Sequence, residues 1–307
     1  MKLQQATESG LNRLSFACMR NAKEVLDEII NWAEKNDDVR AVMLTGSRAN
    51  VHEPANLLSD YDIEIAVNHI NQFLHNEAWL SVFGEILTVV RLDDSFTLRM
   101  VLYKDYVRID FRIHSLKDFK QYTALPELPN NWDIGYVILC DKDHVKATLK
   151  PPTYKAYEIT KPSAEEFLAI VSDFWWDTTY VAKSLWRDEL FYAKYMSDNI
   201  IRFSYLQKVI EWYVASQHNW KITINKFGRR FKKFLDAGTW KELESGFAGS
   251  SREDNWNALF ATIKLFRRLA VTIARDLSYS YPSQLDTEIT TYLNKIKTLG
   301  TNATDLN

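Results

Sequence analysis

Residues 44–67 read LTGSRANVHEPANLLSDYDIEIAV, and this stretch decides the fold of the first half of the chain. An apolar segment ends at a Gly-Ser turn, and twelve residues separate Ser47 from Asp60, where an alternating segment begins. Alternate residues of a strand point to the same face, so we expect Asp60 and Asp62 to lie side by side. Two carboxylates this close repel each other unless a positive group lies between them. The sequence therefore predicts a cation at this position.

Composition and charge limit the class of protein. The 307 residues favour two domains, and 46% hydrophobic with 25% charged residues is typical of a globular protein. The net charge of −2 lacks the basic excess of a broad nucleic-acid surface, so we expect no nucleic-acid partner. Two cysteines, Cys18 and Cys140, are too few for a disulfide framework. With no signal-peptide pattern and no long apolar run, we expect a cytoplasmic protein without a membrane span.

The two halves of the chain have different periodicity. In the first half, helical spacing predicts helices at 20–36 and 76–84, and apolar or alternating runs predict strands at 40–46, 61–67, 95–103, 106–114 and 135–141. In the second half, a capping box of Ser163 and Glu166 begins a helix that runs to about residue 187. Further helices are predicted at 198–218, 225–236, 252–278 and 284–297. The pattern predicts an α+β fold, with a domain of strands and helices at 1–157 and a helical domain at 158–307.

A third acid strengthens the prediction of a cation site. Asp110 lies between apolar residues on a later predicted strand, so it can join Asp60 and Asp62 as an oxygen ligand for Mg²⁺. Gly46 permits close approach of a phosphate, Ser47 offers a hydroxyl and an N–H, and Arg48 can neutralise phosphate charge. A D-x-D pattern alone is usually a pair of solvated acids, but its combination with the Gly-Ser turn favours a nucleotide site. The alternative phosphate loops, GxxxxGK[ST] and GxGxxG, are absent from the sequence.

These features resemble the nucleotidyltransferase superfamily that includes DNA polymerase β. The chain is most similar to its aminoglycoside 6-adenylyltransferase branch, which inactivates streptomycin. The segments that carry the resemblance are AVMLTGSRAN (41–50), SDYDIEIAV (59–67), WLSVFG (79–84), RIDFRI (108–113), FWWDTTYVAKSLWRDELFYAKYM (174–196) and NKFGRRFKKFL (225–235). The resemblance implies a mixed β-sheet flanked by helices, then a helical bundle, with substrate between the two domains. The first 18 residues extend past the usual start, and RIDFRI has arginines where the family more often has apolar residues and threonine.

The helical half offers candidate acceptor contacts. If 174–196 is one helix, Asp177 and Asp188 lie on nearly the same face because they are eleven residues apart. Streptomycin carries two guanidinium groups, which acidic and aromatic side chains bind well. The predicted acceptor contacts are Trp175, Trp176, Asp177, Asp188 and Glu189. The alternative is that the tryptophans form the bundle core and the acids are solvated. Lys183 and Lys226 are candidate phosphate contacts, with a solvated charged surface as the alternative.

The resulting hypothesis is an Mg²⁺-dependent transfer of AMP from ATP to a hydroxyl of an aminoglycoside, with streptomycin the expected acceptor. Asp60 and Asp62 hold the metal, and Asp110 completes the site and is the candidate base. We expect a monomer or a weak homo-oligomer. The alternatives are the same transfer to another small-molecule or protein hydroxyl, and a nucleotide-binding module without turnover.

Overall fold

The computed structural model describes residues 19–52, 55–92, 97–300 and 302–305. The chain divides into two compact units between Ala156 and Tyr157, one residue from the expected domain boundary. Cys140 is buried and carries a free thiol, whereas Cys18 and the N-terminal extension lie outside the described residues. No helix in the described part of the chain combines the length and apolar character that crossing a membrane requires.

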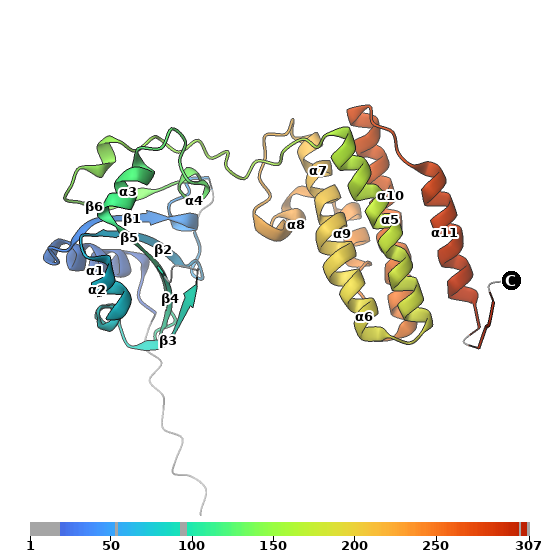
Figure 1. Ribbon diagram of the computed structural model, residues 1–307, viewed down its shortest axis with the longest axis horizontal. Helices are drawn as coiled ribbons and strands as arrows, with labels where there is room; N and C mark the ends of the chain where they lie inside the picture. Colours follow the sequence, from blue (N-terminus) through green and yellow to red (C-terminus); the bar gives the residue numbers. More distant parts are fainter. Residues whose placement is uncertain (1–18, 53–54, 93–96, 301, 306–307) are drawn as a thin grey trace, which may run out of the picture. The chain divides into compact units, whose positions relative to one another are not determined.

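The first unit is built on a six-stranded sheet in the order β3-β4-β5-β2-β1-β6 (Figure 1). Its strands are β1 (Val39–Thr45), β2 (Tyr61–Val67), β3 (Ile86–Leu92), β4 (Leu98–Tyr103), β5 (Arg108–Ser115) and β6 (Val137–Asp141). β2 pairs with β5 in parallel and the other neighbours pair antiparallel, so the sheet is mixed. The predicted mixed sheet is confirmed. The prediction lacks β3, an edge strand whose side chains are mostly exposed and therefore show no alternation of burial.

Helices cover both faces of this sheet (Figure 1). Helix α1 (Ala22–Lys35), α2 (Ile70–His75) and the 3₁₀ helix η2 (Ala78–Phe83) share one apolar core with Ile63 and Ile65 of β2. On the other face, α3 (Leu116–Thr123), α4 (Asn130–Asp133) and η3 (Val145–Ala147) pack over Met43 and Ala66. Because side chains alternate along a strand, Asp62 and Glu64 share the face of Ala66. The acids therefore point to the face that carries α3 and α4.

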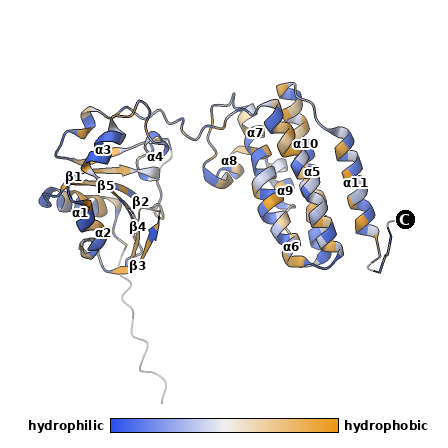
Figure 2. Ribbon diagram, viewed as in Figure 1, coloured by the Kyte–Doolittle hydropathy of each residue, from blue (hydrophilic) through white to orange (hydrophobic). Residues whose placement is uncertain are grey.

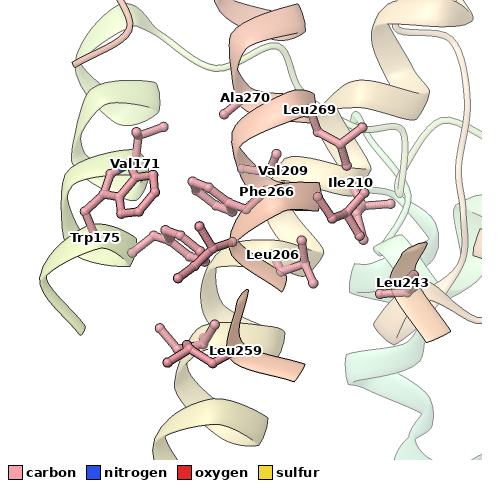
Figure 3. Packing of buried hydrophobic residues seen from close by; sticks show 14 of the residues in the cluster. Val171, Trp175, Leu206, Val209, Ile210, Leu243, Leu259, Phe266, Leu269 and Ala270 are labelled. Atoms are coloured by element: carbon pink, nitrogen blue, oxygen red, sulfur yellow. The ribbon is translucent and has the colours of Figure 1, made fainter. Parts of the chain in front are cut away.

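The second unit is helical. Its longer helices are α5 (Ala164–Trp186), α7 (Gln207–Gln217), α9 (Ala237–Glu244), α10 (Arg252–Leu277) and α11 (Ser283–Thr298), with the shorter α6 (Leu190–Lys194), η5 (Lys226–Gly228) and α8 (Phe231–Phe234). The segment η4 (Tyr195–Leu206) is a π-helix between α6 and α7. Apolar side chains of α5, α7 and α10 meet in one core (Figure 3). In this core the rings of Phe174 and Phe266 stack with their centroids 3.5 Å apart. Hydrophobic and hydrophilic residues are interspersed along these helices (Figure 2). This distribution is typical of helices that bury one side against a core.

The helix predicted from the Ser163 capping box to about residue 187 is confirmed by α5, whereas two other segments predicted as helices are interrupted. The segment 174–196 is not one helix, because α5 ends at Trp186 and Asp188 adopts a left-handed backbone conformation with φ of 61°. The segment 225–236 is not one helix either, because Asn225, Phe227 and Gly228 all have positive φ. Left-handed residues interrupt the i to i+4 hydrogen bonds of an α-helix, and periodicity alone does not reveal them.

Candidate active site

Parallel pairing of β2 with β5 brings the acids of the two strands together. In the register of this pair, Asp62 lies opposite Asp110 and Glu64 lies opposite Arg112. Asp60 precedes β2 on the same face, and we call Asp60, Asp62 and Asp110 the acidic face. Burial changes along this face, since the side chain of Glu64 is 5% exposed and that of Asp60 is 40% exposed. The acidic face therefore opens to solvent at its Asp60 end.

The Gly-Ser turn lies directly against this face. Gly46 begins the 3₁₀ turn η1 (Gly46–Arg48) with φ of 68°, a conformation that favours glycine. A Cβ atom at Gly46 would lie 1.9 Å from Oδ2 of Asp62, so no side chain fits there. The turn that was predicted to bind phosphate is thus in contact with an acid that was predicted to bind metal. Ser47 is exposed on this turn.

A guanidinium group provides the positive charge among the acids. Arg108 donates two hydrogen bonds to Asp110, from Nε at 2.9 Å and from Nη2 at 2.7 Å. Its Nη1 lies 3.4 Å from Oδ2 of Asp60, so one arginine bridges two members of the acidic face. The hydrogen bonds to Asp110, followed by the charges of Asp110 and Asp60, raise the pKa of Arg108 above its ordinary value. Arg108 thus bridges Asp60 and Asp110 in this structure, and the predicted Mg²⁺ at Asp60 and Asp62 stays a prediction.

The surroundings of Asp62 carry more negative than positive charge. Burial raises its pKa to about 6, and the charges of Asp110 and Asp60 add to this shift. Arg108 opposes the shift only weakly, as the smallest of the contributions. A carboxylate with a raised pKa gains most from a second cation, because such an ion removes the repulsion that favours the protonated form.

The donor set of the acidic face fits a hard divalent cation. Carboxylate oxygens are the ligands that Mg²⁺ prefers, and the guanidinium of Arg108 shows that a cation is stable between Asp60 and Asp110. Within the described residues, no three acidic, histidine or cysteine side chains already surround a metal position. Arg108 bridges Asp60 and Asp110 in this structure, so a metal ion would share these two carboxylates with the arginine or displace it. The carboxylate ligands are of the type that Mg²⁺ prefers, and in this structure two of them are paired with Arg108.

The buried carboxylate of Glu64 lies at the inner end of this face and is held by hydrogen bonds. Glu64 accepts hydrogen bonds from Nδ2 of Asn131 at 3.0 Å and contacts Nε2 of His114 at 2.5 Å. His114 is thus a half-buried histidine with a hydrogen-bonding partner. Glu64 and Asn131 were not predicted to take part, although the spacing of Asp60, Asp62 and Glu64 places three acids on one side of the strand. The alternation of YDIEIAV held the signal for Glu64, whereas only the tertiary structure brings Asn131 to it.

Arg48 has a different setting from the one expected. Its Nε and Nη2 donate to the carbonyl of Ser59 at 3.1 and 2.7 Å, and its guanidinium stacks 3.8 Å from the ring of Tyr61. These contacts tie the Gly-Ser turn to the residues that lead into β2. Arg48 therefore positions the turn, and its contact with phosphate stays a prediction.

In the second unit, Trp175 corrects a prediction. Its side chain is 0% exposed within the apolar core, and its Nε1 donates to the hydroxyl of Tyr281 at 3.2 Å. Trp175 is a core residue and not a contact for an acceptor. Its neighbour Trp176 is 63% exposed, because successive residues of an α-helix point in directions about 100° apart. Asp177 accepts a hydrogen bond from the hydroxyl of Tyr205 at 2.7 Å.

The other predicted residues of this unit are exposed or partly exposed. Asp188 and Glu189 lie in the turn after α5, so the predicted common face of Asp177 and Asp188 does not exist. Lys183 lies 4.3 Å from the ring centre of Tyr180, and Lys226 lies 5.8 Å from that of Tyr157. These aromatic contacts neither require nor exclude a phosphate.

A mixed sheet with a Gly-Ser turn seated on a cluster of strand carboxylates defines a nucleotidyltransferase. The model of the family described as streptomycin adenylyltransferase matches residues 19–296, and the chain belongs to this family. The chain is 29% identical over 287 residues to an aminoglycoside 6-adenylyltransferase of Bacillus subtilis (strain 168), which covers 91% of this chain and 98% of that protein. It is 29% identical over 288 residues to the Campylobacter jejuni aminoglycoside 6-adenylyltransferase, with 91% and 96% covered. A crystal structure of an aminoglycoside 6-adenyltransferase from Bacillus subtilis matches with a TM-score of 0.46 at 25% identity, covering 91% of this chain and 100% of that one.

Proposed function

We propose that the protein transfers AMP from ATP to a hydroxyl of an aminoglycoside, with streptomycin as the expected acceptor. The observation that carries the proposal is the contact of Gly46 with Asp62, which joins a phosphate-binding turn to the acidic face. Family membership and relatives named aminoglycoside 6-adenylyltransferases support the choice of reaction. Use of ATP as a substrate supports the expected cytoplasmic location.

The reaction exchanges a phosphoanhydride bond of ATP for a phosphoester bond to the acceptor. The acceptor oxygen forms a bond to the α-phosphorus of ATP, the bond from that phosphorus to the β-phosphate oxygen breaks, and pyrophosphate leaves. Asp60, Asp62 and Asp110 would hold Mg²⁺, which when bound neutralises charge on the phosphates. The exposed Ser47 and the backbone N–H groups of its turn bind phosphate oxygens. Positioning and charge neutralisation then account for most of the catalysis.

The hydroxyl proton needs an acceptor, and Asp110 is our candidate. Both of its carboxylate oxygens accept hydrogen bonds from Arg108 in the structure. Each oxygen keeps a second lone pair, so Asp110 can receive a proton while Arg108 is bound, and release of Arg108 would expose the carboxylate further. Release of Arg108 from the acids would also free its guanidinium for the negative charge of the nucleotide. Arg108 thus acts as a positioning residue in this proposal.

Residues of the second unit offer contacts for a cationic acceptor. The exposed ring of Trp176 and the carboxylate of Asp177 are adjacent on α5. Asp177 and Asp173 both raise the pKa of Tyr205 after the effect of its burial, so negative charge gathers at this part of the helix. A guanidinium group of streptomycin can bind to such a surface through cation–π contact and charge-assisted hydrogen bonds.

The proposal is tested by incubating the purified chain with ATP, Mg²⁺ and a panel of acceptors. We expect pyrophosphate release that depends on an aminoglycoside, and a streptomycin product heavier by one adenylyl group in mass spectrometry. The Asp62→Asn variant is the control for contaminating activity. Release with a neutral sugar alcohol but with no aminoglycoside would favour another small-molecule acceptor. Nucleotide binding without release for any acceptor would favour the binding module.

A further inference from the structure

The second unit contains an arginine whose donors are not all used. Arg202 is 8% exposed and lies in the π-helix η4. Its Nη2 donates to Oδ1 of Asp198 at 3.0 Å and to the carbonyl of Gly246 at 2.8 Å. Within the described part of the chain, its buried Nε and Nη1 have no hydrogen-bond partner. A buried donor without a partner is costly, so an additional acceptor is expected there.

A small cavity adjoins these donors. Its volume is about 10 Å³, and Arg202, Gly246 and Thr262 are among the residues that line it. This volume holds about one water-sized species, which is smaller than a phosphate, a sulfate or a nucleotide. The ring of Phe247 lies 3.8 Å from Cζ of Arg202 and covers one face of the guanidinium, which leaves its edge for an acceptor. Gly246 keeps the cavity open, because a Cβ atom there would lie 2.7 Å from Oγ1 of Thr262 and 3.7 Å from Nη1.

The charge of the cavity selects the kind of acceptor. Two cations, Lys194 and Arg202, line it, and no acid does. Both cations pair with the same carboxylate, since Asp198 lies 3.0 Å from Nζ of Lys194 and 3.0 Å from Nη2 of Arg202. The side chain of Arg202 is 9% exposed and shares this one carboxylate with Lys194, so the positive charge of its guanidinium is only partly balanced, whereas Lys194 and Asp198 are 30% and 34% exposed. A water molecule could fill the cavity and accept both hydrogen bonds, but it would leave this charge uncompensated.

We propose that this cavity is a binding site for a single-atom monovalent anion, with chloride as the ligand. The anion accepts hydrogen bonds from Nε and Nη1 of Arg202 and neutralises the charge that Asp198 leaves over. It would join the π-helix η4 to the turn after α9 and to α10, which all contribute to the cavity. A twelve-residue π-helix is unusual, because most π-helices are single turns and many lie at functional sites. The proposal is independent of the catalytic function.

The direct test is a crystal structure of the full chain grown in bromide. We expect an anomalous bromine peak within hydrogen-bonding distance of Nε and Nη1 of Arg202. Gly246→Ala leaves every charge in place but fills the cavity, so we expect the peak to disappear in this variant. Density for water alone, without anomalous signal, would overturn the proposal.

Hydrogen exchange in solution gives a second test. At a chloride concentration about ten times Kd, mass action should slow exchange that requires opening of the site about tenfold compared with gluconate. We expect this protection in peptides of 195–206 and 245–249. It should be lost in Arg202→Met and kept in Arg268→Met, which removes an arginine of the same unit that pairs with Glu242. If Arg202→Met fails to fold, the bromide experiment on the unaltered chain decides. Equal protection in chloride and gluconate in the unaltered chain would count against the anion.

Discussion

Arg108 and Arg202 are both arginines beside aspartates, but the balance of charge around them is opposite. Arg108 is bridged to two members of a three-carboxylate face, so negative charge exceeds positive charge there. Arg202 shares a single carboxylate with Lys194, and two of its donors are unused among the described residues. The comparison teaches that the local sum of charges, and not the ion pair itself, indicates what a site will bind. By this criterion we expect the acidic face to bind a further cation and the cavity at Arg202 to bind an anion.

The largest expected effect is the loss of catalysis when one carboxylate of the acidic face is removed. Asp60→Asn and Asp62→Asn each remove a charged ligand with little change of shape. We expect a fall in kcat of at least about 10²–10³, because metal ligation stabilises the transition state by several kcal/mol. Steady-state pyrophosphate release measures it. Asp143→Asn is a suitable control, since this acid pairs with Arg40 on the same unit. Turnover near normal in either variant would contradict the role of the acidic face.

The contact between the turn and the acidic face is tested by Gly46→Ala. The added methyl group would overlap Oδ2 of Asp62, and alanine is strained at a φ of 68°. We expect loss of most activity and a fall in stability of about 1–3 kcal/mol, measured by urea unfolding. At Gly300 an added Cβ meets no atom within 4 Å, so Gly300→Ala should change neither quantity. An active and stable Gly46→Ala enzyme would show that the turn can leave the acid without consequence.

The raised pKa of Asp62 predicts a gain of stability from a variant that is inactive. Its folded pKa of about 6 lies above the ordinary value of 3.8, so the folded state binds more protons than the unfolded state between these values. Stability of the metal-free chain should therefore fall as pH rises from about 4 to about 6. Asp62→Asn removes this dependence and should stabilise the chain at pH 7 by up to about 3 kcal/mol. Urea unfolding in EDTA across this pH range measures the difference between the two chains. A variant less stable than the unaltered chain at pH 7 would mean that Asp62 is not under repulsion.

A smaller effect concerns the acceptor. Asp177→Asn should raise Kd for streptomycin roughly tenfold, because one charge-assisted hydrogen bond is worth about 1.5–3 kcal/mol. Asp188 lies in an exposed turn after α5, so Asp188→Asn is the matched control and should leave Kd unchanged. Calorimetric titration at one salt concentration measures both. A loss of affinity in Asp188→Asn but not in Asp177→Asn would reverse the assignment.

The smallest expected effect is a change in metal affinity when Arg108 is replaced. Arg108→Gln removes the group that competes with a divalent cation, so Mn²⁺ should bind a few-fold more tightly in the absence of nucleotide. Arg91→Gln removes an arginine from β3 that pairs with Glu77 and should leave Mn²⁺ affinity unchanged. Calorimetry gives both values. Weaker binding in Arg108→Gln would mean that the arginine organises the acids for the metal and does not compete with it.

The fold and the acidic face could be predicted because they depend on local pattern. Alternation in YDIEIAV placed Asp60 and Asp62 on one face, and the apolar flanks of Asp110 placed it on a strand. The predicted contacts of the second unit were harder to place, because α5 ends at Trp186 and helical periodicity does not show the left-handed conformation of Asp188. Trp175 and Trp176 are identical in type and adjacent in sequence, yet one is buried and the other exposed. The alternation of RIDFRI already places Arg108 on the face of Asp110, whereas its reach to Asp60 and the cavity at Arg202 depend on tertiary contacts that the sequence does not show.

The central claim is that the acidic face holds a divalent cation together with a nucleotide, and a Mn²⁺ titration tests it most directly. Electron paramagnetic resonance counts free Mn²⁺ in the presence of the full chain and a non-hydrolysable ATP analogue. We predict saturable binding to the unaltered chain and its loss in Asp62→Asn, with the nucleotide analogue increasing the affinity only in the former. Equal binding of Mn²⁺ and analogue by the two chains would contradict the account.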